Sequence, residues 1–169
     1  MNKKKTITII LSLSLLMPII YMVFFKETLQ DKFLQCKAFI IIDRYPADGS
    51  NIYTSYSLVM KKQDSQNAEA TFSGSIITRR DKNTETKHVF ASNYFSYDTH
   101  GNRIDVFTRN VVIRPGNNAS SQSLRDYVSL SLVAGSQHSY YLFVNETNIA
   151  SFGEANFPRV ACSKEITPP

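Results

Sequence analysis

Two cysteines, Cys36 and Cys162, have the most distinctive side-chain chemistry in this 169-residue chain. They either form one disulfide bond or remain two separate buried thiols. The three histidines stand singly at positions 88, 100 and 138. Neither they nor the cysteines follow a spacing by which proteins hold zinc. The sequence therefore predicts no metal site, and the state of the cysteines depends on the compartment that they face.

The segment from Gly135 to Ser139, GSQHS, places a serine directly beside His138. Neighbouring side chains on a strand point to opposite faces, so we do not interpret them as a catalytic pair. The chain also contains no nucleophile elbow, phosphate-binding loop, dinucleotide fingerprint or zinc-protease helix. We predict a protein that is not an enzyme, with no catalytic residues and no cofactor.

Residues 6–25, TITIILSLSLLMPIIYMVFF, carry no charge. At about 1.5 Å per residue, such a helix spans about 30 Å, the thickness of a hydrocarbon core. A cleaved secretory signal is the alternative interpretation. Cleavage requires small residues after the apolar run, but the first alanine is Ala38 and the first glycine is Gly49. We therefore predict an uncleaved transmembrane signal-anchor.

Lys3, Lys4 and Lys5 precede this segment. Because positive residues stay in the cytoplasm, we expect a cytoplasmic tail at 1–5 and a periplasmic location for the rest, in a bacterial inner membrane. The expected parts outside the membrane are a stalk at 26–35, a folded domain at 36–165 and a frayed tail at 166–169. The net charge of +5 includes the three lysines, so nothing indicates direct nucleic-acid binding.

This topology favours a disulfide bond between Cys36 and Cys162, because the periplasm is oxidising. The bond would close a loop of about 125 residues and would stabilise the domain by ~4–5 kcal/mol in the chain-entropy account. It would also bring the Cα atoms of the two cysteines to within ~7 Å of each other.

Apolar and polar residues alternate with a period of two through most of the soluble part, and turn-forming residues interrupt the pattern every ten to fifteen positions. Such alternation, rich in β-branched and aromatic residues, is typical of antiparallel β-structure. The expected strands lie at 36–43, 52–62, 68–80, 86–98, 103–115, 138–146, 148–154 and 157–164.

Between 123 and 135 the spacing changes, and Leu124, Tyr127, Val128 and Leu132 recur at helical intervals. Ser121 or Ser123 is the expected N-cap and Gly135 the expected end. The sequence thus predicts a mainly β domain with one short helix. Its antiparallel strands must form a small barrel, a curled sheet or two packed sheets to protect their edges.

Aromatic residues are abundant, with 9 Tyr and 11 Phe. Core filling explains most of them. A second interpretation is that six tyrosines, each with an apolar ring and a polar tip, form a ligand-binding or partner-binding face. These candidates are Tyr53, Tyr56, Tyr94, Tyr97, Tyr140 and Tyr141.

Several stretches together resemble the FidL-like family of small bacterial inner-membrane proteins, which includes PsaF- and MyfF-type fimbrial regulators. They are the lysine-started span, the cysteine before the first strand, FSGSI, AGSQHSYYLFV and FPRVACSK. The most specific is the Pro-x-x-x-Cys-Ser motif at Pro158 to Ser163. In plan the chain is more distantly similar to ToxS and VtrC.

The resemblance implies a lipocalin-like barrel and a heterodimeric partner, a membrane-bound ToxR/CadC-like winged-helix transcription activator that controls virulence or fimbrial genes. The companion would bind, stabilise and modulate the activator's periplasmic sensor domain during environmental sensing. The VtrC-type case implies a small amphipathic ligand such as a bile salt. The alternatives are a stand-alone periplasmic barrel that binds a lipid or bile acid, and a fimbrial assembly factor.

Overall fold

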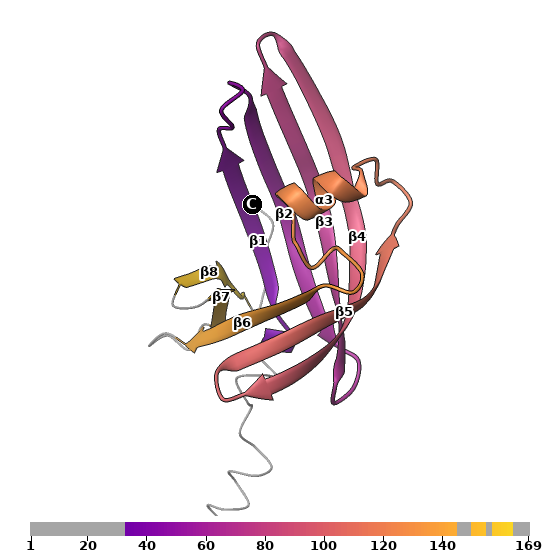
Figure 1. The fold of residues 1–169 in the computed structure, drawn as a ribbon, viewed down its shortest axis with the longest axis vertical. Coiled ribbons are helices and arrows are strands. Elements are labelled where there is room, and N and C mark those ends of the chain that lie inside the picture. Colours follow the sequence, from indigo (N-terminus) through magenta and orange to yellow (C-terminus); the bar gives the residue numbers. More distant parts are fainter. Residues whose placement is uncertain (1–32, 145–149, 155–156, 164–169) are drawn as a thin grey trace, which may run out of the picture.

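Eight antiparallel strands dominate the fold, which confirms the prediction of a mainly β domain (Figure 1). The structure, a computed structural model, describes residues 33–144, 150–154 and 157–163. The strands are β1 (Lys37–Arg44), β2 (Asn51–Lys62), β3 (Asn67–Arg80), β4 (Asn83–His100), β5 (Arg103–Ile113), β6 (Gln137–Val144), β7 (Ala150–Glu154) and β8 (Phe157–Ala161); the helix α3 (Ser121–Tyr127) lies between β5 and β6.

The sheet is a simple meander, in which each strand pairs with the next one along the chain. Burial alternates as the sequence pattern predicts. Along β2, every second residue from Ile52 to Met60 is buried, and the residues between them are partly exposed. The buried side chains line the inside of the curled sheet. The outer face carries hydroxyl, amide and charged groups together with some exposed apolar side chains.

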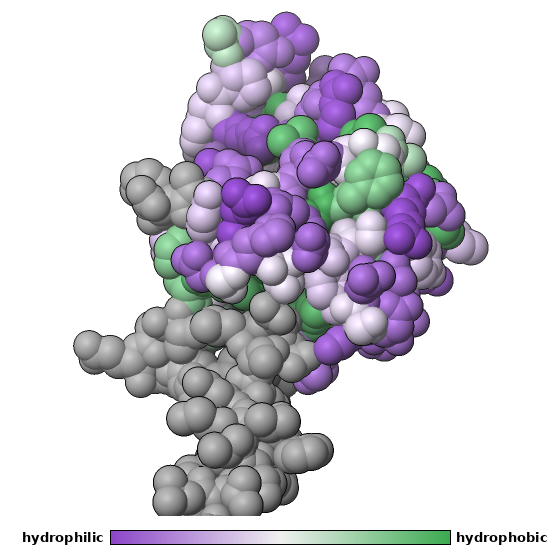
Figure 2. Space-filling model, turned by 60° about the horizontal axis from the view of Figure 1, so that its bottom comes forward, coloured by the Kyte–Doolittle hydropathy of each residue, from purple (hydrophilic) through white to green (hydrophobic). Residues whose placement is uncertain are grey.

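The outer surface shows little continuous apolar area on the face that Figure 2 draws. Hydrophilic residues predominate there, and hydrophobic residues form small separate patches.

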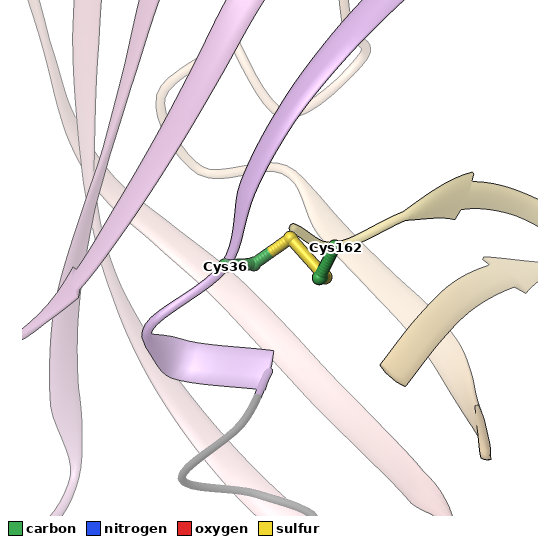
Figure 3. Close-up of a disulfide and its surroundings, with 2 residues drawn as sticks. All are labelled: Cys36 and Cys162. Atoms are coloured by element: carbon green, nitrogen blue, oxygen red, sulfur yellow. A yellow bond between two sulfur atoms is a disulfide. The ribbon is translucent and has the colours of Figure 1, made fainter. Parts of the chain in front are cut away.

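The two ends of the sheet meet at one point and close it nearly into a barrel. Ser163 donates a backbone hydrogen bond of 2.7 Å to the carbonyl of Lys37, at the start of β1. Beside this contact, Cys36 and Cys162 form the predicted disulfide, with their Cα atoms 4.9 Å apart and a sequence separation of 126 (Figure 3).

Closure is incomplete beyond this point. In the described part of the chain, β1 pairs with β8 only through the bridge between Lys37 and Ser163. From Ala38 to Arg44, β1 is paired with β2 on one side, and no described strand is paired with it on the other. We refer to this stretch as the open edge of β1.

The helical residues just before β1 complete the core. Phe33 and Leu34 are 2% and 0% exposed. The ring of Phe33 meets that of Phe152 edge to face, with centroids 5.1 Å apart. Packing of the β-domain therefore begins within the segment predicted as a stalk, three residues before Cys36.

The helix α3 is shorter than predicted, and both of its predicted boundaries are wrong. Its N-cap is Ser120, whose hydroxyl accepts a hydrogen bond from the backbone of Ser123, and its last residue is Tyr127 rather than a residue near Gly135. The hydroxyl of Ser129 bonds the backbone N–H of Ser131, and the backbone N–H of Leu132 bonds the carbonyl of Ser129. Such local serine bonds compete with helical ones and turn the chain instead.

The predicted cytoplasmic tail at 1–5, with Lys3, Lys4 and Lys5, lies outside the described residues, as do the membrane span at 6–25, most of the stalk and the tail at 166–169. In the ranges that the structure describes, no helix has the length and apolar character needed to cross a bilayer.

Gly74 allows β2 and β3 to approach closely at the centre of the sheet. A Cβ atom at this position would lie 2.0 Å from the carbonyl oxygen of Ser55 and 2.5 Å from the Cα of Tyr56. Both atoms belong to the backbone of β2, so neither can move aside without distorting the strand. The curl of the sheet here depends on a residue without a side chain.

We expect substitution of either cysteine by serine to lower the free energy of unfolding by about 3–5 kcal/mol, because the loop constraint on the unfolded chain is lost. The double variant should be little less stable than either single variant, since all three lack the same bond. Urea titration followed by far-ultraviolet circular dichroism measures these differences. Additive losses would contradict the role of the bond.

Gly74→Ala should destabilise the protein by about 3 kcal/mol, at the upper end of the range for overpacking, because the methyl group meets backbone atoms. The matched control is Ser73→Ala, an exposed position on the same strand, which should change stability by less than about 0.5 kcal/mol. Thermal unfolding of the two variants in parallel checks the prediction, and equal stability would refute the close approach.

Candidate functional site

A cavity of about 810 Å³ lies between the inner face of the sheet and the segment that follows α3. This volume falls within the range of about 300–1,000 Å³ that is common for small-molecule sites. All eight strands contribute to the wall, and more than half of the lining residues are apolar. Its apolar members include Ile42, Leu58, Met60, Phe72, Phe95 and Val106.

The mouth of the cavity lies beside the open edge of β1. Six of the lining residues are exposed: Ile41 and Arg44 in β1, Arg125 in α3, Leu130 after it, Glu154 in β7 and Arg159 in β8. The cavity thus opens between these three parts of the molecule, where the sheet fails to close.

Polar side chains gather around the turn at Ser131, and we call them the polar cluster. Its members are Asn93, Thr108, Ser129, Ser131, His138 and Tyr140. The carbonyl oxygen of Ser131 accepts hydrogen bonds from Asn93 Nδ2, at 3.1 Å, and from Thr108 Oγ1, at 3.0 Å. These bonds hold the segment after α3 against β4 and β5.

Asn93 keeps one hydrogen-bonding atom free. Its side chain is 1% exposed and lines the cavity, and its Oδ1 has no hydrogen-bond partner among the described residues. The bond from Nδ2 to the Ser131 carbonyl fixes the amide orientation, because a flipped amide would place two acceptors together. An unpaired buried acceptor costs about 1–3 kcal/mol, so it requires an explanation.

His138 presents a second such atom. Its Nε2 is buried and has no partner within the described ranges, and the residue lines the cavity. The imidazole ring lies 6.4 Å from the ring of Tyr140, measured between centroids. The polar cluster therefore contains two unsatisfied buried groups among the residues that line the cavity.

Two tyrosines in the wall are held in their neutral form. Burial raises the pKa of Tyr56 to about 12, and its hydroxyl donates a hydrogen bond of 3.0 Å to the carbonyl of Val128. Burial also raises the pKa of Tyr140 to about 12, with a further contribution from the charge of Glu154, while hydrogen bonds with Ser129 and Ser131 act in the opposite direction. Both phenols therefore stay uncharged near neutral pH.

The structure brings only two of the six candidate tyrosines together, since Tyr56 and Tyr140 both line the cavity. Tyr53, Tyr94 and Tyr141 each stand next to an inward residue on their strand and are partly exposed. Tyr97 packs against the edge of the core, and its hydroxyl donates to the carbonyl of Asp64.

The serine and histidine of GSQHS do not form a pair. Ser139 directs its hydroxyl to Asp105 Oδ1, a bond that lowers the pKa of this carboxyl group, whereas His138 lines the cavity. Within the part of the chain that the structure describes, no group of three His, Cys, Asp or Glu side chains is placed to hold a metal ion.

Asn93, the most informative cavity residue, was not among the predicted site residues, although the alternating pattern of its strand includes it. Val89, Ala91 and Phe95 are apolar and occupy alternate positions of their strand, and Asn93 lies on the same face between Ala91 and Phe95. A polar residue within an inward apolar series is the signal that was available. The segment after α3 could not be placed from spacing, because it is not regular.

Comparisons of the chain with models of protein families, with curated proteins and with solved structures found no match. The candidate site is therefore supported by its geometry alone. What it offers is an apolar cavity with a small polar cluster, open beside an unpaired strand edge.

The raised pKa values predict a loss of stability at high pH. Both tyrosines ionise near pH 10 in the unfolded chain but only near pH 12 in the folded one, so their stabilising effect is complete below pH 10 and is lost as the pH rises toward 12. Tyr56 alone should account for about 1 kcal/mol between pH 9 and pH 11.

Urea titrations at these two pH values measure the effect. The loss should be smaller in Tyr56→Phe and smallest in the double variant with Tyr140→Phe, because phenylalanine does not ionise. An unchanged loss in the double variant would contradict the assignment.

Proposed function

We propose that this protein is a non-enzymatic, membrane-anchored periplasmic co-regulator. It binds the periplasmic sensor domain of a ToxR/CadC-like winged-helix transcription activator, and the contact is made by a strand of the activator that pairs with the open edge of β1. The identity of the partner follows from the resemblance to the FidL-like family. The observation that supports this mode of contact is the unpaired edge itself.

The register of β1 shows which backbone groups are available. Met60 donates to the carbonyl of Cys36, and Ser163 on the opposite side donates to the carbonyl of Lys37. Because hydrogen bonding alternates along an antiparallel strand, even-numbered residues of β1 face β2 and odd-numbered ones face the open edge. The N–H and C=O groups of Phe39 and Ile41 are therefore directed to a strand that could be added there.

The side chains support the same conclusion. Phe39 and Ile41 are 59% and 56% exposed, although each is large and apolar. Natural proteins usually protect an edge with lysine, proline or a bulge, and AFIIID from Ala38 to Asp43 contains none of these. A strand added at an exposed edge is a recurrent mode of peptide recognition.

Anchoring in a common membrane would strengthen such a contact. Two proteins held in one bilayer meet at a high effective concentration, so a modest interface stays occupied. A strand at the open edge of β1 would also lie beside the mouth of the cavity, next to Arg44. Binding of the activator and access to the cavity would then affect each other.

A second candidate function is favoured by the cavity. All eight strands contribute lining residues, so the cavity lies inside the curled sheet, as it does in a stand-alone ligand-binding barrel. A lipid or bile acid would then stabilise the protein against heat in the absence of any activator, in proportion to its concentration.

The partner hypothesis predicts that Ile41→Pro separates the two proteins. Proline removes the N–H that faces the open edge, while the bonds between β1 and β2 remain. The amount of activator that co-purifies with the full-length tagged chain should fall about tenfold, which corresponds to ~1.4 kcal/mol, or about one to two hydrogen bonds. The activator to use is the product of a neighbouring regulator gene.

Ile41→Thr is the matched control, because it also removes the large apolar side chain but keeps the N–H; most of the binding should survive. Equal co-purification of the wild type and Ile41→Pro would exclude the edge as the contact. If the activator fails to co-purify, and if its cellular level does not change when this gene is deleted, the co-regulator function is refuted.

A further inference from the structure

The polar cluster contains no acidic side chain. Its members are an amide, three hydroxyl-bearing aliphatic side chains, an imidazole and a phenol, and no lysine or arginine is among them. The arginines that line the cavity are at its mouth and are already engaged. Arg125 Nε lies 2.7 Å from Asp126 Oδ1, and Arg159 lies 3.3 Å from Glu154.

Arg44 is engaged in a similar way. It donates a hydrogen bond of 2.7 Å to the carbonyl of Asp126, and its guanidinium lies over the ring of Tyr127, 5.9 Å from the centroid. A carboxylate or phosphate beside Asn93 would thus be buried with no lysine or arginine to pair with it, which is unfavourable. An uncharged group does not meet this barrier.

The unpaired Oδ1 of Asn93 indicates which chemical group a ligand must present. Oδ1 is an acceptor, so it requires a donor, and a hydroxyl or a primary amide supplies one. The same kinds of group can also accept, which suits the unpaired Nε2 of His138 when that nitrogen carries the proton. The apolar side chains of the wall favour a ligand whose remaining part is apolar.

We infer that the cavity binds a single-chain amphipathic molecule whose uncharged head, a hydroxyl or primary amide, is turned inward and donates a hydrogen bond to Asn93 Oδ1. Its hydrocarbon chain lies along Phe72, Phe95 and the neighbouring apolar wall and leads toward the mouth beside β1. This site differs from the proposed contact with the activator, because Phe72, Asn93 and Phe95 lie on β3 and β4 and not at the open edge of β1.

The test compares three probes that share one C12 chain with a photoreactive diazirine and an alkyne tag, and that differ only in the head: an alcohol, a primary amide and a carboxylate. The full-length protein is placed in lipid nanodiscs, irradiated and digested, and the labelled residues are located by mass spectrometry. We expect the alcohol and the amide to label cavity residues at least tenfold more than the carboxylate. Excess untagged alcohol should remove this labelling.

Asn93→Leu, which keeps the size of the side chain but removes the acceptor, should reduce labelling by the alcohol about tenfold. Ala70→Phe places a ring in the cavity and should abolish labelling by every probe, whereas Ser73→Phe adds the same ring to the outer face of the same strand and should have no effect. Formation of the disulfide and resistance to protease report whether each variant is folded. If Asn93→Leu does not fold, the comparison of head groups in the wild type decides.

Three results would overturn the inference. Equal or stronger labelling by the carboxylate would show that an anionic head binds, as at the arginines of the mouth. No labelling of cavity residues above that of Ala70→Phe would show that the cavity holds water only. Unchanged labelling in a folded Asn93→Leu would show that the chain binds but that its head does not reach the amide.

Discussion

The structure depends on how β1 and β8, the two edge strands of an eight-stranded meander, are joined to each other. A sheet of this kind either closes fully or leaves backbone hydrogen-bonding groups exposed. Here closure is achieved at one point, where Ser163 bonds Lys37 and Cys36 is joined to Cys162. The disulfide substitutes for a complete ladder between β1 and β8. Because the constraint acts at one end only, the rest of β1 can stay unpaired without separating the first strand from the last.

The open edge and the cavity are consequences of this single closure. A full ladder between β1 and β8 would cover the gap in which Arg44, Glu154 and Arg159 surround the mouth of the cavity. The same missing pairing thus leaves both the edge of β1 and the mouth of the cavity accessible, and these are the features on which the two proposals rest. An added strand would pair with the open edge of β1, and a bound ligand would fill the cavity beside it. Both proposals therefore depend on the same missing ladder between β1 and β8.

Much of the fold was predictable, because a half-buried strand leaves a period of two in its sequence. The strand expected at 52–62 is observed at Asn51–Lys62, and the one expected at 68–80 at Asn67–Arg80. The disulfide followed from the compartment rather than from local pattern. The end of α3 was not predictable from apolar spacing, since the hydroxyl of Ser129 redirects the chain. The cavity was not predictable either, because its volume depends on how far an irregular segment stands from the sheet.

The buried Asn93 is the main argument against interpreting the cavity as a packing defect. A cavity formed only by imperfect packing would be lined by apolar atoms, and filling it with a larger apolar side chain would raise stability. This wall instead contains an amide that is fixed on one side by Ser131 and unsatisfied on the other. Leucine at this position would avoid the unpaired acceptor, at the expense of one bond to the segment after α3. That the chain has asparagine here, in the middle of an inward apolar series, is better explained by a group that enters the cavity than by the stability of the empty barrel.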